Sequence, residues 1–327
     1  MTATAIVTGA AGFIGSTLVE LLLSRGYCVL GIDNFRTGNR ENLSEVQGHK
    51  QFQLLETDIS KAELSKEVME ILLSPKFKSK EIDIVFHLAA ISSVRESTEN
   101  PVLVNDTNVS GTVNLLEIAR KLDARRFVFS SSAAVYGDPE KMPVYENTPF
   151  HPLSPYAASK IAGEFYIHSF DELYGIGGTI LRYFNVYGPR QAYSEYSGVI
   201  SIFTSQAINN EPLTIEGSGE QTRSFIYVED VVRATLAAGE ADSAGKVTIN
   251  LSGTESISIS KLARFIRENV EGSKSEVINV RPRIGDVKNS IGSMERAHKI
   301  LQFYPEVRLE EGLRKTIDWY RSHQSSR

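Results

Sequence analysis

The stretch that most constrains how this chain can fold lies near its start, from Thr4 to Leu23, and reads TAIVTGAAGFIGSTLVELLL. A short apolar run is followed by glycines at positions 9, 12 and 15, and then by apolar residues at helical spacing. Strand, tight turn and helix in this order open a dinucleotide-binding fold. Gly9 permits the sharp turn, Gly12 lets the backbone approach a pyrophosphate, and Gly15 lets the helix pack on the strand. The free N–H groups of the helix N-terminus then face the phosphates.

A second apolar run ends at Asp33, where a partner for a ribose 2′-hydroxyl belongs. An acid at this position repels a 2′-phosphate, so we expect NAD rather than NADP. Arg36 and Arg40 keep NADP open as an alternative; otherwise they are solvated loop charges. Asp58 follows a third apolar run and has two interpretations, an acceptor for the adenine amino group or a cap for a helix that begins near residue 60.

Composition restricts the class of protein. The chain has 327 residues, 41% hydrophobic, and a net charge of −5 without a basic run, so we expect a globular protein that does not bind nucleic acid. No apolar run approaches the ~20 residues of a membrane span, and no basic segment precedes the first strand, so neither a membrane anchor nor a signal peptide is expected. The single cysteine, Cys28, allows no intrachain disulfide or cysteine zinc site, which is typical of the cytoplasm. Its apolar neighbours indicate packing in a strand rather than a reactive thiol.

The order of elements predicts an α/β fold, a doubly wound Rossmann sheet of mostly parallel strands. Expected strands are 4–8, 28–32, 51–55, 82–87, 126–131 and 177–183. Expected helices are 13–24, 61–73, 101–122 and 155–174. We expect an NAD-binding domain over residues 1–183 and a smaller C-terminal α/β substrate lobe over 184–327, with some later elements able to return to the main sheet.

Hydroxyl groups end the fifth of these strands, at Ser130, Ser131 and Ser132. Downstream, Tyr156 and Lys160 are four residues apart, so they share one face of a predicted helix. A tyrosine has an ordinary pKa of ~10, which a neighbouring ammonium and a positive nicotinamide ring would both lower. This pattern predicts a general base, with a serine hydroxyl holding the same substrate oxygen. His87, by contrast, is expected to be packed or hydrogen-bonded rather than catalytic.

Three motifs in this order, Gly9-x-x-Gly12-x-x-Gly15, the Ser-Ser-Ser strand end and Tyr156-x-x-x-Lys160, resemble the extended short-chain dehydrogenase/reductases. Over nearly its whole length the chain looks most like the nucleotide-sugar 4-epimerases of the UDP-glucose and UDP-N-acetylglucosamine type. The supporting stretches are 33–38, 108–111, 130–137, 181–188, 223–230 and 283–286. The resemblance implies NAD as the cofactor, a UDP-sugar as the substrate, and a homodimer formed through the helices near 101–122 and 155–174.

The resemblance also assigns site residues. Ser132, Tyr156 and Lys160 would be catalytic. The cofactor would contact Gly9, Gly12, Phe13, Ile14, Gly15, Asp33, Asn34, Asp58, Ile59, Leu88, Ala89, Ala90, Asn108, Ser130, Tyr156, Lys160 and Tyr183. The substrate would contact Ser93, Ser132, Tyr156, Asn185, Val199, Arg223, Arg283, Asp286 and Ser290. Ser92 and Ser93 have a plainer alternative as helix N-caps, and no metal site is expected.

Two alanines indicate which reaction follows. Dehydratases and decarboxylases of this family carry acidic residues just after the strand-end hydroxyls, where this chain has Ala133 and Ala134. Alanines move no protons, so we expect the 4-keto sugar to take the hydride back on its other face, which is 4-epimerisation. A nucleotide-sugar dehydratase, a 4-ketosugar reductase and a non-catalytic dinucleotide sensor are the alternatives. Ser290 is small, and the resemblance implies that a small residue there leaves room for an N-acetyl group.

Overall fold

A parallel sheet forms the centre of the computed structural model, which describes residues 3–74, 77, 81–191, 198–281 and 287–323. Among these residues the sheet has seven strands in the order β11-β6-β5-β4-β1-β2-β3. They are β1 (Thr4–Thr8), β2 (Cys28–Asp33), β3 (Phe52–Glu56), β4 (Ile84–His87), β5 (Arg126–Ser132), β6 (Gly178–Tyr183) and β11 (Val247–Leu251). The order reverses between β1 and β4, and the carboxyl ends of these two strands flank the crevice where such folds bind ligands.

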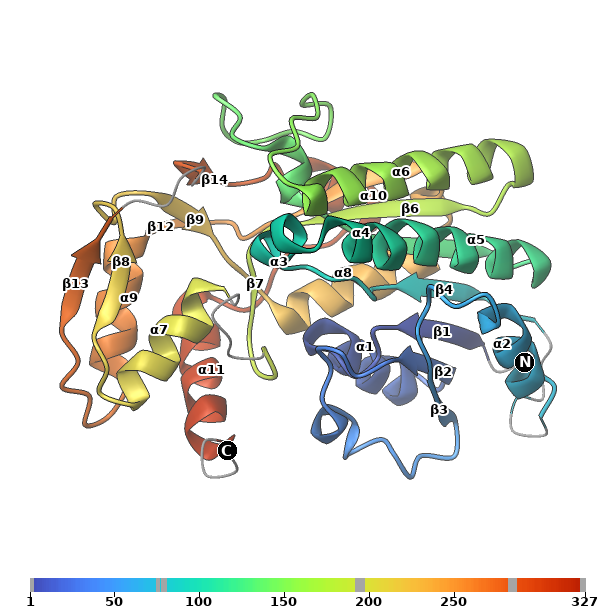
Figure 1. The fold of residues 1–327 in the computed structure, drawn as a ribbon, viewed down its shortest axis with the longest axis horizontal. Helices are drawn as coiled ribbons and strands as arrows, with labels where there is room; N and C mark the ends of the chain where they lie inside the picture. Colours follow the sequence, from blue (N-terminus) through green and yellow to red (C-terminus); the bar gives the residue numbers. More distant parts are fainter. Residues whose placement is uncertain (1–2, 75–76, 78–80, 192–197, 282–286, 324–327) are drawn as a thin grey trace.

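Helices cover both faces of this sheet (Figure 1). One face carries α1 (Phe13–Ser24), α8 (Val228–Glu240) and α10 (Glu295–Leu301); the other carries α2 (Leu64–Leu72), α5 (Gly111–Lys121) and α6 (Pro155–Tyr174), with α3 (Val94–Glu99) and α4 (Pro101–Asn105) beside α6. Successive strand residues point to opposite faces. Ala5 and Val7 therefore pack with α1 and α8, whereas Ile6 packs with α2 and α5.

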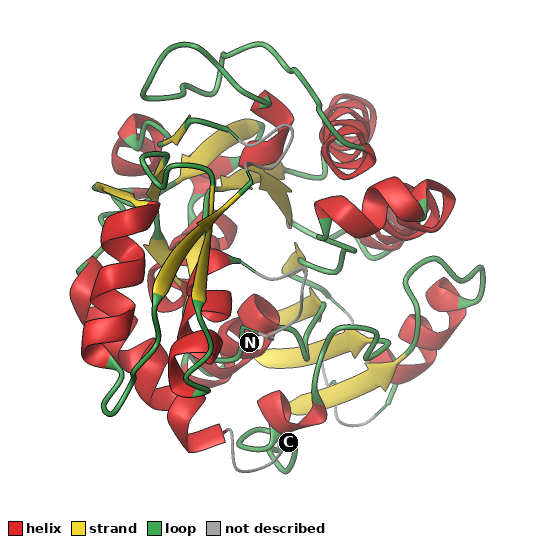
Figure 2. Ribbon diagram, turned by 60° about the vertical axis from the view of Figure 1, so that its left-hand side comes forward, coloured by secondary structure: helices red, strands yellow, loops and turns green. Residues whose placement is uncertain are grey.

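A smaller lobe follows β6 and stands at one end of the main sheet (Figures 1 and 2). Its helices are α7 (Val199–Ile208), α9 (Ile259–Asn269) and α11 (Leu309–His323); its strands are β7 (Val186–Tyr187), β8 (Leu213–Glu216), β9 (Thr222–Ser224), β10 (Ile226–Tyr227), β12 (Ser256–Ser258), β13 (Val277–Val280) and β14 (Asn289–Ser290). One apolar cluster runs from α1 and α8 into α7, α9 and α11, so the lobe shares a core with the sheet.

The predicted fold class is confirmed, and the predicted strands match β1 to β6 with small shifts at their ends. The predicted domain boundary between residues 183 and 184 stays a prediction. Two elements that follow it, β11 and α8, pack with the main sheet. Within the described residues, no helix combines the length and the apolar composition that crossing a membrane requires.

One predicted helix differs in detail. The segment 101–122 is α4, a π-helical turn over Asp106–Ser110, and α5. The wider turn contains Thr107, which lines the cavity described below, and Asn108, which bonds the backbone of Ile91. Cys28 begins β2 and is half-buried against the apolar cluster of α2 and α5, so it packs in the strand as expected but is not fully enclosed.

Candidate active site

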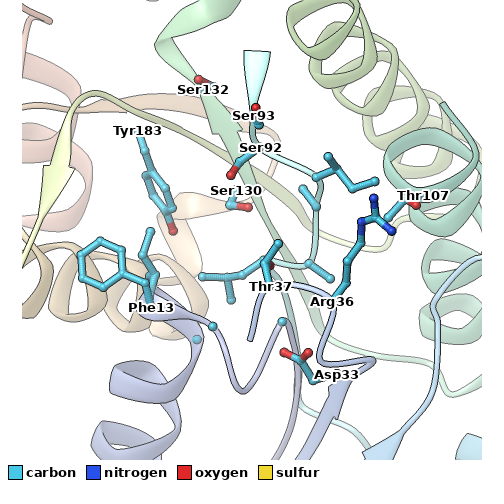
Figure 3. A pocket seen from close by; sticks show the side chains of 18 of the residues that line it. Phe13, Asp33, Arg36, Thr37, Ser92, Ser93, Thr107, Ser130, Ser132 and Tyr183 are labelled. Atoms are coloured by element: carbon cyan, nitrogen blue, oxygen red, sulfur yellow. The ribbon is translucent and has the colours of Figure 1, made fainter. Parts of the chain in front are cut away.

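A cavity of about 480 Å³ opens at the carboxyl ends of the central strands (Figure 3). The predicted site residues that line it are Gly9, Gly12, Phe13, Ile14, Gly15, Asp33, Asn34, Ile59, Leu88, Ala89, Ala90, Ser93, Ser130, Ser132, Tyr156, Lys160 and Tyr183. They come from β1, α1, β2, β4, β5, α6 and β6 and from the segments next to these elements. The structure therefore brings the predicted catalytic residues and most of the predicted cofactor residues into one cavity; Asp58 and Asn108 are not among its lining residues.

The turn between β1 and α1 has no room for side chains. A Cβ added at Gly15 would lie 1.9 Å from the carbonyl oxygen of Gly9. Gly9 has a φ of +68°, and a Cβ there would lie 2.9 Å from the backbone nitrogen of Ala89. Gly12 is the N-cap of α1 and, as a glycine, places no side chain of its own between the helix N-terminus and the cavity. The turn thus offers backbone donors and the positive end of the helix dipole to a diphosphate.

Asp33 ends β2 and is only 8% exposed. Its Oδ2 accepts the N–H of Ala11 at 2.9 Å, and its Oδ1 accepts the N–H of Phe35 at 2.8 Å. Burial raises the pKa of Asp33 above its ordinary value, and these backbone donors oppose the rise. The carboxyl is thereby fixed at the edge of the cavity, where it can accept a ribose hydroxyl.

The two loop arginines are not simply solvated charges. Arg36 pairs with Glu96 and Arg40 pairs with Glu56, each with 2.5 Å between nitrogen and oxygen. Of the four side chains, those of Arg36 and Glu96 line the cavity.

Two neighbouring residues follow β3. Asp58 accepts hydrogen bonds from the N–H and hydroxyl of Ser60 and from the amide of Asn34. Because α2 begins only at Leu64, Asp58 closes a local turn and does not cap that helix. Thr57 lines the cavity with a buried hydroxyl that has no hydrogen-bond partner among the described residues. This unpaired hydroxyl fits a polar nucleotide. Thr57 was not among the predicted site residues, although it directly follows the end of β3.

Tyr156 and Ser132 meet in the cavity. Tyr156 is 8% exposed and shares a hydrogen bond with Ser132. Burial raises the pKa of the Tyr156 phenol above its ordinary value, and the hydrogen bond with Ser132 only partly offsets the rise. Among the chain's own groups, desolvation of the phenolate outweighs the contacts that favour it, so the expected lowering of this pKa stays a prediction that depends on the nicotinamide ring.

Lys160 lies one turn further along α6 and is 3% exposed. Its Nζ donates a hydrogen bond to the carbonyl oxygen of Ser130 at 2.7 Å. Burial lowers the pKa of Lys160 to about 7, while the carboxylate of Glu164 acts in the opposite direction. The amine of Lys160 is therefore anchored at the end of β5, two residues before Ser132.

His87 and Asn108 are buried beside the cavity and do not line it. His87 is buried, and its Nδ1 lies 2.8 Å from the hydroxyl of Thr8 and its Nε2 2.9 Å from that of Thr112. The hydroxyl of Thr112 donates to the carbonyl oxygen of Asn108, so it accepts from Nε2–H. The hydroxyl of Thr8 accepts backbone N–H groups and can donate its own proton to Nδ1, which is the pattern of a neutral imidazole. Burial also lowers the pKa of His87 well below its ordinary value. As predicted, His87 is hydrogen-bonded in the core.

Part of the predicted substrate set gathers at β14. Strands β14 and β9 are parallel neighbours, with Ser290 opposite Arg223 in the register. The hydroxyl of Ser290 lies 3.5 Å from the amide nitrogen of Asn185. The cavity lining does not include Asn185, Val199, Arg223 or Ser290, but it includes Phe184 and Val186 on either side of Asn185. Val199 begins α7, next to Gly198 in the lining. Arg283 and Asp286 lie outside the described residues.

Ser93, a predicted substrate residue, lines the cavity and also caps α3 by accepting the N–H of Glu96, and Ser92 lines the cavity as well.

Other lining residues were not predicted as site residues. The unpredicted lining residues are Ile32, Arg36, Thr37, Thr57, Ile91, Glu96, Thr107, Ser131, Phe184, Val186, Arg190, Gln191 and Gly198. Most lie one or two positions from a predicted residue; Thr37, Glu96, Arg190 and Gln191 have no such signal.

Comparison with known proteins agrees with this geometry. Residues 6–316 match the protein family described as GDP-mannose 4,6 dehydratase. A putative UDP-glucose 4-epimerase of Methanocaldococcus jannaschii is 39% identical over 97% of this chain and 98% of its own length.

Two solved structures superpose over nearly the whole chain. The first is a UDP-N-acetylglucosamine 4-epimerase from Methanobrevibacter ruminantium in complex with UDP-N-acetylmuramic acid, with a TM-score of 0.90, 37% identity, and coverage of 99% of this chain and 100% of that one. The second is a UDP-glucuronic acid 4-epimerase from Bacillus cereus in complex with UDP-glucuronic acid and NAD, with a TM-score of 0.88, 33% identity, and coverage of 98% and 99%. The predicted cofactor is thus one that a solved relative holds. With the glycine turn, Asp33 and the Ser-Tyr-Lys set in one cavity, the chain belongs to the extended short-chain dehydrogenase/reductases, in the group of the UDP-sugar 4-epimerases, which are isomerases.

Proposed function

We propose that this chain interconverts the two 4-epimers of a UDP-hexose through a transient 4-keto sugar, with NAD as a cofactor that is reduced and reoxidised within one turnover. The observation that carries this proposal is the meeting of Ser132, Tyr156 and Lys160 in the cavity that also contains the glycine turn and Asp33. Relatives that bind UDP-sugars and NAD support it.

The chain's own residues move and hold the proton. Tyr156 takes the proton of the sugar 4-hydroxyl, and Ser132, which is bonded to Tyr156, holds the same oxygen. When bound, NAD would accept one hydride from carbon 4 and later return it, and its positive ring would favour the phenolate of Tyr156. When the hydride has returned to the opposite face of carbon 4, Tyr156 gives the proton back to the oxygen.

The residues after Ser132 favour epimerisation over dehydration. Ala133 and Ala134 open a 3₁₀ turn, in which the Ser132 oxygen accepts the N–H of Ala134 at 3.2 Å. Removing the sugar 6-hydroxyl and the C5 proton would need an acid and a base at this point. Neither alanine supplies one, so the 4-keto sugar takes the hydride back.

The size of the side chain at Ser290 in β14 would decide which hexose is accepted. Arg223, Arg283 and Asp286 anchor the UDP part, which leaves the hexose free to turn over between the two hydride transfers. Ser290 is half-buried beside Asn185, and its small side chain leaves room for the N-acetyl group of UDP-N-acetylglucosamine. We expect Ser290→Tyr to lose turnover of the N-acetyl sugars and to retain that of UDP-glucose. Equally poor turnover of the N-acetyl substrate by both forms would contradict this assignment.

A sugar with a carboxylate is less suited to the cavity. Of the described residues that line it, the cations are Arg36, Lys160 and Arg190. Glu96 pairs with Arg36, the carbonyl oxygen of Ser130 accepts from Lys160, and Glu20 pairs with Arg190. The carboxylate of a uronic acid would have to compete with these partners for the cations. We therefore expect UDP-glucuronate to be a poorer substrate than the neutral UDP-hexoses.

The test is a product analysis. The protein is incubated with UDP-glucose, UDP-galactose, their N-acetyl forms and UDP-glucuronate, and the products are separated. An epimerase produces the 4-epimer without a net change in the absorbance of reduced nicotinamide. A ketosugar reductase would consume the reduced cofactor, a dehydratase would release a deoxy sugar, and a dinucleotide sensor would convert nothing; each of these results would overturn the proposal.

We also propose a homodimer through the outer face of α4 and α6. The large apolar side chains exposed there are Val102, Leu103, Phe165, Tyr166, Leu173 and Tyr174, and both Val102 and Leu173 are 72% exposed. A group of exposed apolar side chains of this kind marks an interaction surface. Phe165→Glu should convert the dimer to a monomer in light scattering; a wild-type chain that is already monomeric would contradict the assignment.

A further inference from the structure

Arg36 and Glu96 form an ion pair in the cavity close to Asp33. Arg36 follows Asp33 by three residues in the loop after β2, whereas Glu96 comes from α3, sixty residues further along the chain. The Nη2 of Arg36 donates to Oε1 of Glu96 at 2.5 Å. Figure 3 shows the Arg36 side chain extending toward Thr107, away from the Asp33 carboxylate.

This arrangement bears on the difference between NAD and NADP, which is one phosphate on the adenosine ribose. A protein that binds this phosphate places an arginine near the position of the acid, because the guanidinium fork matches phosphate oxygens. Arg36 lies in the correct loop to do so. Its guanidinium is already bound by a carboxylate, so a 2′-phosphate would have to displace Glu96 from it.

The second arginine of this region provides an internal comparison. Arg40 pairs with Glu56 at the same 2.5 Å, but the side chains are 62% and 55% exposed and neither lines the cavity. The side chains of Arg36 and Glu96 are 43% and 19% exposed, and both line it. Water and salt screen the exposed pair more strongly. An effect on the cofactor is therefore expected from Glu96 and not from Glu56.

We propose that Glu96 determines cofactor specificity together with Asp33. Asp33 repels a 2′-phosphate, and Glu96 keeps Arg36 paired, so that Arg36 does not bind that phosphate. This role concerns the adenosine end of the cofactor alone. It therefore holds for whichever sugar the chain accepts.

The test is an exchange experiment on the protein with its NAD bound and without sugar. The protein is equilibrated with increasing NADP, and the NAD that remains bound is measured after extraction, which gives the ratio of the two affinities. Glu96→Gln should raise the affinity for NADP relative to NAD at least about fivefold, because the freed Arg36 makes a charge-assisted hydrogen bond to phosphate. Glu56→Gln, the matched control, should leave the ratio as in the wild type.

Two further variants separate the role of Arg36 from a general loss of negative charge. In Arg36→Ala/Glu96→Gln the gain should disappear, because no arginine is released. Arg36→Ala alone should keep the wild-type ratio, because Glu96 already holds Arg36 away. Two results for Glu96 would overturn the proposal: an unchanged NADP-to-NAD affinity ratio in a folded Glu96→Gln protein, or a rise in this ratio that survives in the double variant. Two results for the other residues would also overturn it: an equal rise in Glu56→Gln, or a ratio that falls in Arg36→Ala.

Discussion

Glu164 and Arg182 form a buried ion pair, with 2.6 Å between Oε2 and Nη2, that joins helix α6 to strand β6. The second oxygen, Oε1, accepts hydrogen bonds from Nε of Arg182 and from the hydroxyl of Ser131, which lines the cavity. One carboxylate therefore connects the helix that carries Tyr156 and Lys160 to the strand that ends in Ser132.

Glu164→Gln should destabilise the protein by about 3–5 kcal/mol, because it leaves the guanidinium of Arg182 buried without its counter-charge. The loss is measured as the free energy of unfolding in urea. Glu117→Gln is the control, since Glu117 pairs with Arg120 on the surface, where ion pairs contribute little. Similar losses in the two variants would show that burial of the Glu164 pair has no special effect.

Lys160→Met should change how stability depends on pH. The pKa of Lys160 is about 7 in the folded chain and ordinarily 10.5. Between these values the unfolded chain binds a proton that the folded chain does not, so stability rises with pH, by up to ~1.4 kcal/mol per unit; below about pH 7 this dependence ends. The wild type should therefore gain stability relative to Lys160→Met from about pH 7 to about pH 9, below the range where tyrosines titrate. Urea unfolding at several pH values checks this, and a constant difference between the two proteins would contradict it.

Tyr156→Phe should lower the rate of epimerisation by about 10²–10⁴, the usual contribution of a general base, without loss of NAD binding. Ser132→Ala should also lower the rate, because the hydroxyl that bonds Tyr156 is removed. Tyr166→Phe, on the exposed side of the same helix, is the control and should keep the wild-type rate. Rates come from the product analysis, and a fully active Tyr156→Phe protein would exclude the phenol as the base.

Gly15→Ala should weaken NAD binding by at least about tenfold and destabilise the fold by about 1–3 kcal/mol, because its Cβ would overlap the carbonyl oxygen of Gly9 and the turn must move. Gly48→Ala is the control, since among the described residues beyond its two chain neighbours no atom lies within 4 Å of the added Cβ. NAD retained after dialysis and urea unfolding measure the two effects. Wild-type NAD retention in Gly15→Ala would mean that the turn tolerates a side chain.

The sequence by itself determined the elements whose signals are local. The glycine turn after β1, the hydroxyls that end β5, and the shared helical face of Tyr156 and Lys160 follow from spacing and periodicity within a few residues. These signals also carry the family resemblance, which the comparisons confirm.

Only the tertiary structure decided the properties that depend on residues remote in the chain. The sequence showed Arg36 as a loop charge, but its partner Glu96 is sixty residues away. The spacing of Tyr156 and Lys160 does not show the burial that raises the pKa of the Tyr156 phenol. Spacing along the chain gives direction and periodicity. Desolvation and ion pairing depend on which surfaces meet, and those are set when distant elements pack.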